Sequence, residues 1–152
     1  MSIEDDIAFL ERVPSLAVLG RDALRILAIG AENRYLHDGN VLFSQGETAD
    51  AGYVVQEGLL SLVRGAAEPF TVGPGTLLGE LALLTETTRP ATATALEPST
   101  VIRIPRSLFL KMLEGYPEAA VRLQESLLTR AELSEMEMHR VRRVLDGAGG
   151  QT

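Results

Sequence analysis

The sequence predicts a mainly β protein: a double-stranded β-helix, or jelly roll, with helices at both ends. Short apolar or alternating runs recur between residues 31 and 104, turn signals separate them, and helical periodicity appears on either side. Regularly spaced short strands are typical of a sandwich or barrel and not of alternating β–α units. The 152 residues have the length of one ordinary domain, so we treat residues 1–152 as one domain.

Residues 1–30 are predicted to form N-terminal helices. Ile3 to Leu10 fits a short amphipathic helix that ends before Pro14. A second helical pattern begins at about Asp22, and Gly30 stands where a helix end favours a left-handed residue. The acidic start of the chain lacks the basic segment of a signal peptide, so we expect a cytoplasmic location.

Residues 31–104 are predicted to form the roll. The apolar runs are residues 35–36, 41–43, 53–55, 59–63, 70–72, 92–96 and 101–104. Turn signals such as Asp38-Gly39, Glu57-Gly58 and Gly73-Pro74-Gly75 separate them. Each run is therefore expected to be a strand that ends at a tight turn.

Residues 105–146 are predicted to be helical, and residues 147–152 form a glycine-rich tail. A short segment, Arg106 to Leu113, precedes Pro117, which suits the first turn of a long helix. An apolar or small stripe then runs through Ala120, Leu123, Leu127, Ala131, Ser134, Met138, Val141 and Leu145. A helix from Pro117 to Leu145 would span about 43 Å, which exceeds one small roll. We therefore favour a homodimer through this helix over packing on the chain's own roll.

Composition narrows the partners and the chemistry. The formal net charge is −7 and Lys111 is the only lysine, so neither duplex DNA nor an anionic membrane is the expected partner. No apolar run approaches the roughly 20 residues that span a bilayer. The absence of cysteine excludes thiolate-held iron–sulfur clusters. His37 and His139 are isolated and predicted to be surface residues, so no metal site is expected.

A glycine-rich stretch, Gly73 to Ala95, carries the predicted site. A turn at Gly79 leads into a short apolar helical segment, Glu80 to Leu84, and a polar loop then delivers Arg89. Free amides at the start of such a turn favour an anion, and the Arg89 guanidinium is a charged fork suited to two phosphate oxygens. An ionised Glu80 is an acceptor and can hold a sugar hydroxyl. Donors for phosphate beside an acceptor for a sugar indicate a nucleotide site.

These residues resemble the phosphate-binding cassette of the cyclic-nucleotide-binding domain family, which includes catabolite activator proteins and the regulatory subunits of cAMP-dependent protein kinase. The family pattern is Gly-Glu-(Leu/Met)-(Ala/Gly)-Leu, followed at a fixed interval by Arg-(Ser/Thr/Ala)-Ala. It reads here as Gly79-Glu80-Leu81-Ala82-Leu83 and Arg89-Pro90-Ala91. The likeness extends upstream to Val41–Glu47, Asp50 and Tyr53–Gly58, and downstream to Ile104–Phe109.

The resemblance implies a cyclic mononucleotide as ligand, cAMP before cGMP, and no cofactor. By this likeness Glu80 would bind the ribose 2′-hydroxyl and Arg89 the cyclic phosphate. The amides of Gly79, of Ala82 and of the residues after Arg89 would complete the anion cradle. In activator-type members a hydroxyl on the long helix meets the base, and Ser134 falls at that place with Arg130 beside it. The predicted binding residues are Gly79, Glu80, Leu81, Ala82, Arg89, Pro90, Ala91, Arg130 and Ser134.

Pro90 departs from the family pattern. Proline has no backbone N–H, so one phosphate donor is missing. A lost hydrogen bond to a charged group costs about 1.5–3 kcal/mol, or roughly ten- to a hundredfold in affinity. Arg89 has an alternative role, a structural ion pair with Glu80 or Glu86.

Three classes of function were weighed. The leading hypothesis is a cytoplasmic ligand sensor that signals to a partner protein through its C-terminal helix, without an attached DNA-binding domain. The second is a nucleotide-free β-roll that serves as a dimeric protein-interaction module, which Pro90 favours. An enzyme is not expected, because the sequence has no phosphate-binding loop with its lysine, no paired-histidine zinc motif and no serine elbow.

Overall fold

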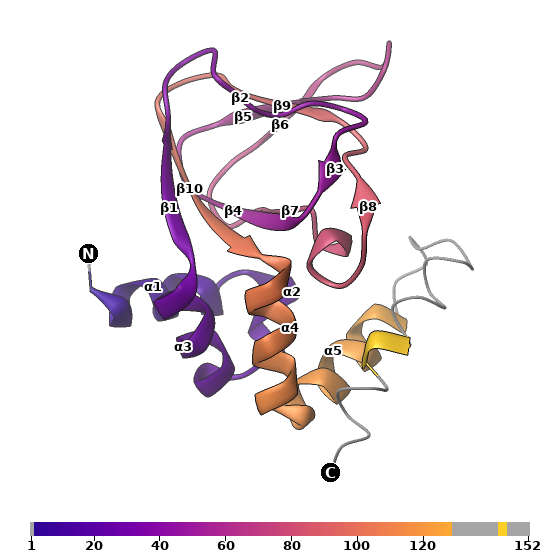
Figure 1. Ribbon diagram of the computed structural model, residues 1–152. Coiled ribbons are helices and arrows are strands. Elements are labelled where there is room, and N and C mark those ends of the chain that lie inside the picture. The colour runs from indigo at the N-terminus through magenta and orange to yellow at the C-terminus, as the bar shows by residue number, and fades with distance from the viewer. Residues whose placement is uncertain (1, 129–142, 146–152) are drawn as a thin grey trace.

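The computed structural model describes residues 2–128 and 143–145 and consists of a β-roll that sits on a group of helices (Figure 1). Three helices precede the strands: α1 (Ile3–Glu11), α2 (Pro14–Ala17) and α3 (Arg21–Gly30). Two follow them, α4 (Arg106–Gly115) and α5 (Pro117–Leu128). Among the described residues, no helix combines the length and hydropathy that crossing a membrane requires.

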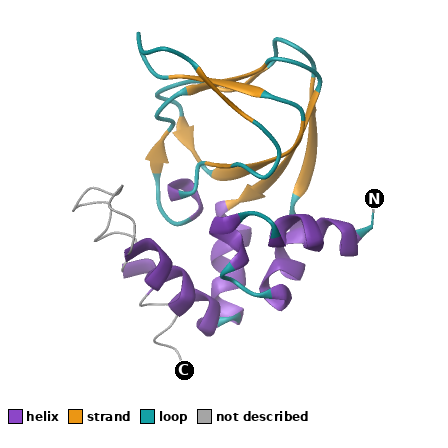
Figure 2. Cartoon of the chain, turned by 180° about the vertical axis from the view of Figure 1, so that it is seen from behind, coloured by secondary structure: helices purple, strands orange, loops and turns teal. Residues whose placement is uncertain are grey.

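The roll consists of two antiparallel sheets that face each other, seen from behind in Figure 2. The first has the order β1 (Glu32–Leu36), β10 (Ser99–Pro105), β4 (Ala51–Glu57) and β7 (Leu77–Leu78). The second has the order β2 (Val41–Phe43), β9 (Thr92–Ala95), β5 (Leu60–Val63) and β6 (Phe70–Val72). A short ribbon of β3 (Thr48–Ala49) and β8 (Thr87–Thr88) closes one end. The predicted fold class, mainly β with flanking helices, is confirmed.

The roll has its own apolar core between the two sheets. The inward-facing residues are aliphatic apart from two aromatic rings: Leu36, Phe43, Tyr53, Val55, Leu60, Leu62, Leu78, Ala93, Ala95 and Val101. A second core lies under the first sheet and is formed mainly by the helices: Ile7, Leu10, Val13, Leu16, Leu19, Leu24, Leu27, Ile104, Phe109, Met112 and Leu113 are among its members.

Strand β4 explains why the central apolar runs are continuous and not strictly alternating. Successive side chains of a strand point to opposite faces. Val55 faces the roll core and Val54 faces the helix core, and both are fully buried. Because the first sheet is covered on both faces, β4 is apolar on both faces as far as Val55, and the polar Gln56 and Glu57 follow at its end.

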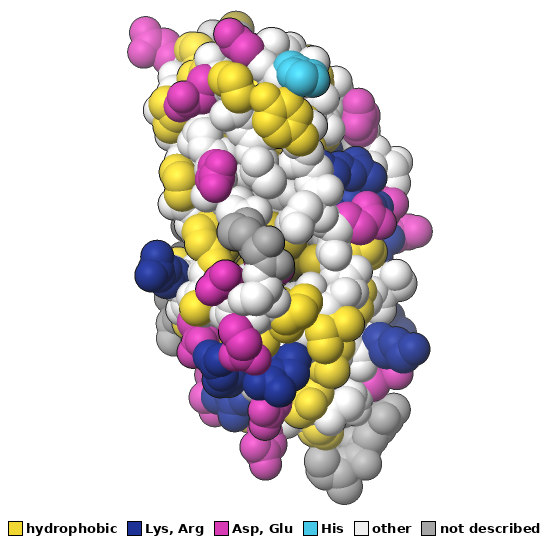
Figure 3. Space-filling model, turned by 90° about the vertical axis from the view of Figure 1, so that its left-hand side faces the viewer, with side chains coloured by type: hydrophobic (Ala, Val, Ile, Leu, Met, Phe, Trp, Pro, Cys, Tyr) yellow, Lys and Arg dark blue, Asp and Glu magenta, His cyan; other side chains and the backbone are white. Residues whose placement is uncertain are grey.

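The N-terminal helices are tied together by a cap and by surface ion pairs. The Ser2 side chain accepts from the Asp5 amide and Asp5 accepts from the Ser2 amide, which closes a capping box at the start of α1. Arg21 of α3 pairs with Glu4 and Glu11 of α1. Figure 3 shows basic and acidic side chains interspersed on one face of the protein, so this face has no field of a single sign.

The predicted helix and strand order is confirmed, but the structure adds short elements and overturns one detail. The sequence analysis missed α2, β3, β7 and β8, which contain two to four residues each. The prediction of a left-handed Gly30 was wrong, because Gly30 is helical and the chain turns directly into an extended Ala31. A Cβ at Gly30 would lie 2.6 Å from Leu108, so this glycine allows α3 and α4 to pack closely.

The predicted long helix is described only in part. Helix α5 begins at Pro117, as expected, and three residues of the predicted stripe, Ala120, Leu123 and Leu145, are buried in the helix core of their own chain. The stripe residues Ala131, Ser134, Met138 and Val141 lie outside the described residues. For the three stripe residues whose burial is known, the structure supports packing on the chain's own core.

Gly58 provides a test of the β4–β5 turn. It has φ +96°, and a Cβ there would overlap the Ser99 side chain and lie 2.7 Å from the Ser99 Cα. Gly39 has a similar φ of +87° with nothing within 4 Å of its Cβ position. We expect Gly58→Ala to lower the free energy of unfolding by about 2–5 kcal/mol and Gly39→Ala by about 1 kcal/mol, measured by urea denaturation. Equal losses would contradict the close contact with Ser99.

Candidate functional site

The predicted cassette residues surround one cavity of about 230 Å³ at the β3–β8 end of the roll. Between β7 and β8 the chain forms a single 3₁₀ turn, η1 (Leu81–Leu83), where the sequence predicted a short helical segment over Glu80 to Leu84. The walls come from three places in the sequence: Ala49 in β3, Gly79 to Ala82 at the start of η1, and Thr87 to Pro90 at the end of β8. The fold of the roll therefore brings together three segments that are far apart in the sequence.

Backbone hydrogen bonds fix the position of Arg89. Its N–H donates to the Glu47 carbonyl oxygen at 2.8 Å, and its own carbonyl oxygen accepts from the Gly46 N–H at 2.9 Å. The Gly46-Glu47 turn therefore holds the loop that carries Arg89. Gly79 leaves room for the side chain, because a Cβ there would lie 2.5 Å from Nη1 of Arg89.

The Arg89 guanidinium is buried over two neighbouring aromatic rings. The residue is 4% exposed, and Cζ lies 4.4 Å from the Phe43 ring centroid and 5.4 Å from that of Tyr53. A guanidinium over an aromatic face is attracted by the ring quadrupole. Ring faces do not replace the hydrogen bonds that its N–H groups form in water. Nη1 is buried and has no hydrogen-bond partner in the part of the chain that the structure describes.

Burial acts on the charge of Arg89. Desolvation lowers the pKa of the guanidinium from its ordinary value, whereas Tyr53 and the carboxylates of Asp50 and Glu47 raise it. An arginine keeps its proton in proteins. The site thus contains a buried cation whose Nη1 lacks an acceptor among the described residues, and an anion in the cavity would supply one.

Glu80 does not pair with Arg89, as the alternative role of Arg89 required, but contacts Ser15. Its Oε2 accepts from the Ser15 hydroxyl of α2 at 3.4 Å. No ion pair joins Arg89 to Glu80 or to Glu86 among residues 2–128 and 143–145. The structural ion pair considered for Arg89 is therefore not formed, and cation and carboxylate reach the cavity separately.

The backbone amides at the cavity differ in their availability. The Ala82 N–H donates to the Gly79 carbonyl oxygen at 3.0 Å within η1, so it is not free in this structure, and its place in the anion cradle stays a prediction. The N–H groups of Leu81 and Ala91 form no backbone hydrogen bond with the described residues. Leu81 lines the cavity, and Ala91 packs beside the roll core just after Pro90.

Arg106, the first residue of α4, is bonded to the cassette. Its Nη1 donates to the carbonyl oxygens of Ala49, Ala82 and Thr85 at 3.1, 3.3 and 2.9 Å. Two of these carbonyls belong to η1 and the residues that follow it, and the third belongs to β3. The start of α4 is therefore connected to the cavity wall by one side chain.

Of the predicted binding residues, the structure brings together Gly79, Glu80, Leu81, Ala82, Arg89 and Pro90 around the cavity. Arg130 and Ser134 lie outside the described residues. The sequence analysis missed the aromatic cradle of Phe43 and Tyr53, which it identified only as strand residues, and it gave no signal for Ser15. Among the remaining predictions on isolated residues, His37 is exposed, as expected, and His139 is not described.

Comparisons with known proteins point in the same direction. The model of the cyclic nucleotide-binding domain family matches residues 33–116. A cyclic nucleotide-binding-like protein from Brucella abortus is 40% identical, with a TM-score of 0.65 over 72% of this chain and 98% of that one. The regulatory domain of Toxoplasma gondii PKA, solved with cAMP, shares the fold at 22% identity, with a TM-score of 0.68 over 84% of this chain and 50% of that one.

A match to longer proteins concerns only a small part of them. Lysophospholipase nte1 of Aspergillus oryzae is 35% identical over 106 residues, which is 66% of this chain and 7% of the enzyme. The chain thus spans a small fraction of the length of these curated relatives, and the likeness does not extend to the rest of them.

Two arginines at this end of the roll allow a test of the unpartnered cation. A buried charge can often be replaced by an apolar side chain of similar size without loss of stability. We expect Arg89→Met to leave the free energy of unfolding unchanged or raise it by about 1 kcal/mol in urea denaturation. Arg106→Met, which abandons three carbonyl acceptors, should lower it by about 1–3 kcal/mol. A loss at Arg89 as large as that at Arg106 would mean that the guanidinium is satisfied without a ligand.

Proposed function

The chain belongs to the cyclic nucleotide-binding domain family, and from this premise we propose that it is a cytoplasmic regulatory module that binds a cyclic mononucleotide, cAMP before cGMP, and signals to a partner protein. One observation carries the proposal: the buried Nη1 of Arg89, which has no hydrogen-bond partner among the described residues, lies at a cavity that Glu80 also lines. A cyclic phosphate would accept from the former, and the ribose 2′-hydroxyl would donate to the latter. The PKA regulatory domain of Toxoplasma gondii, which shares the fold, was solved with cAMP, and this supports cAMP as a ligand to test.

Binding rather than catalysis is proposed because the cavity groups suit recognition. Arg89 supplies charge and hydrogen bonds, and Glu80 supplies an acceptor. The match to nte1 covers too little of that enzyme to bring its activity to this chain.

The C-terminal helices are the proposed output. Arg106 holds η1 and the second residue after it through the Ala82 and Thr85 carbonyls, so a shift of the cassette around a ligand would displace the start of α4. Such a displacement transmits a signal only if the ligand binds one arrangement more tightly than the other. A partner protein that contacts α4 or α5 would read the difference.

Pairing with a second copy through the C-terminal helix remains part of the proposal. Ala120 and Leu123 are already buried by their own chain, so a second copy would have to contact a different face of α5. Val121 is 47% exposed and offers apolar surface for that contact. Neither the sensor role nor the signal to a partner protein depends on pairing with a second copy.

A nucleotide-free interaction module is the competing function, and two observations favour it. Pro90 removes one phosphate donor, and the cavity of about 230 Å³ is smaller than the roughly 300–1,000 Å³ of typical small-molecule sites. On the sensor hypothesis the cavity receives the sugar phosphate, and the base extends beyond it. Calorimetry separates the two functions.

We expect wild-type protein to release or absorb heat with cAMP and cGMP, with tighter binding of cAMP, in isothermal titration calorimetry. Arg89→Met should weaken binding about a hundredfold or more, because the phosphate loses its charged fork. Arg64→Gln, an exposed arginine of the β5–β6 turn, is the matched control and should bind as wild type does. No heat from folded wild-type protein at millimolar nucleotide would favour the interaction module.

Pro90→Ala should restore a phosphate donor. The new N–H would belong to the cavity wall that Pro90 now forms. We expect affinity for cAMP to rise about tenfold, up to roughly a hundredfold, in the same calorimetric titration. Pro74→Ala, an exposed proline in the turn before β7, is the control and should leave affinity unchanged. An unchanged affinity in Pro90→Ala would mean that the phosphate does not approach position 90.

A further inference from the structure

The short helix α2 reaches the cavity wall through Ser15. The Ser15 hydroxyl donates to Oε2 of Glu80 at 3.4 Å, although the two residues are 65 positions apart in the sequence. Ser15 is half-buried, and its neighbour Leu16 is part of the helix core, so α2 is held against the roll. A residue of the N-terminal helices thus contacts the side chain that is proposed to hold the ligand's sugar.

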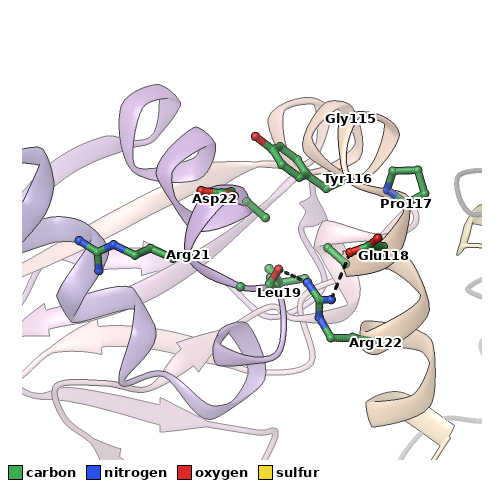
Figure 4. A pocket seen from close by; sticks show the side chains of 11 residues that line it. Leu19, Arg21, Asp22, Gly115, Tyr116, Pro117, Glu118 and Arg122 are labelled. Atoms are coloured by element: carbon green, nitrogen blue, oxygen red, sulfur yellow. Dashed lines mark hydrogen bonds and ion pairs between the residues drawn. The ribbon is translucent and has the colours of Figure 1, made fainter.

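The other end of α2 is held by α5. Arg122 of α5 donates from Nε to the Val18 carbonyl oxygen at 2.6 Å and from Nη2 to the Leu19 carbonyl oxygen at 2.7 Å. Figure 4 shows this guanidinium between Leu19 and Glu118 at the junction of the two helical segments. Carbonyls at the end of a helix have no partner within it, and a guanidinium that donates to two of them fixes α5 relative to α2.

We propose that Ser15 is a positioning residue for Glu80, and that α2 links the ligand's sugar to α5 through the Val18 and Leu19 carbonyls that hold Arg122. This inference rests on the proposed function, because it concerns the group that would bind the ribose 2′-hydroxyl. It adds a residue and a connection that the cassette motif does not contain.

The chemistry of a carboxylate permits both contacts at once. An ionised carboxylate has two oxygens and about four acceptor positions, so a hydrogen bond from Ser15 leaves capacity for a sugar hydroxyl. Glutamate has several rotatable bonds, and ordering it at the moment of binding costs conformational entropy. Ser15 orders the side chain beforehand and so improves recognition of the 2′-hydroxyl alone.

The connection to α5 follows from the same contacts. If the position of α5 sets the position of α2, it also sets the orientation of Glu80. Coupling between two sites is reciprocal, so a ligand that requires Glu80 in this orientation favours the arrangement of α5 seen here. The sugar hydroxyl, and not only the phosphate, then contributes to the signal.

The ratio of affinities for cAMP and 2′-deoxy-cAMP tests the positioning role, because only cAMP has the hydroxyl that Glu80 would accept. We expect Ser15→Ala to weaken cAMP about two- to fivefold in calorimetry, a modest loss since the 3.4 Å contact is long, and to leave 2′-deoxy-cAMP unchanged. Ser15→Thr keeps the hydroxyl and should restore the wild-type ratio. Ser107→Ala, an exposed serine of α4, is the control.

Two results would overturn the positioning role. Equal loss of affinity for both nucleotides in Ser15→Ala would indicate a general structural effect, and an unchanged or higher affinity for cAMP would indicate that Ser15 does not prepare Glu80. Failure of the proposed function has a different appearance. In that case wild-type protein binds neither nucleotide, and both proposals are wrong. If binding depends on Arg89 but the ratio of cAMP to 2′-deoxy-cAMP affinity does not change in Ser15→Ala, only the positioning role of Ser15 is wrong.

Arg122→Gln tests the connection to α5 in the full chain. The variant removes the anchor without touching the cavity, so the ratio of cAMP to 2′-deoxy-cAMP affinity should fall by the same two- to fivefold as in Ser15→Ala. Arg25→Gln, which removes an exposed arginine paired with Glu4, should leave the ratio at its wild-type value. A wild-type ratio in Arg122→Gln would show that α2 holds Glu80 independently of α5.

Discussion

The buried guanidinium of Arg89 is the constraint on which the cavity depends. Its position requires the Gly46-Glu47 turn for the backbone, the absence of a side chain at Gly79, and the neighbouring rings of Phe43 and Tyr53 beneath it. These groups come from separate strands and loops, so they meet only when the roll closes. A buried guanidinium nitrogen without a hydrogen-bond acceptor destabilises the ligand-free fold, and this cost is what an anionic ligand would relieve. Stability elsewhere must come from the two apolar cores, neither of which includes Arg89.

Much of this arrangement was predictable from the sequence, because the roll's turns and apolar runs are local signals. Strands of three residues or more were found, whereas β3, β7 and β8 were missed because two residues are too few to display a period of two. Helix α2 was missed because Pro14 was interpreted only as the end of the preceding helix, although proline also suits a first helical turn.

The site was predictable where its residues are contiguous and not where they are distant. The cassette gave Gly79, Glu80 and Arg89 directly, since a turn, an acceptor and a charged fork lie in one stretch of sequence. Phe43 and Tyr53 were identified only as strand residues. The alternation of side chains along a strand predicts which face a ring occupies, but it does not predict that the ring will contact the Arg89 guanidinium. The contact of Ser15 with Glu80 depends on how α2 docks on the roll, a packing outcome without a local sequence pattern.

The two cores also explain how a ligand in the roll could influence the helices. Sheet β1-β10-β4-β7 is shared: Val55 and Val101 face the roll core, while Val54 and Ile104 face the helices. At the edge of this sheet, side chains also bridge the two layers directly. Arg106 and Ser15 are such bridges, one from α4 to η1 and the other from α2 to Glu80. Since these contacts involve the phosphate side and the sugar side of the cavity respectively, one ligand would engage both helices only by filling both halves of the site.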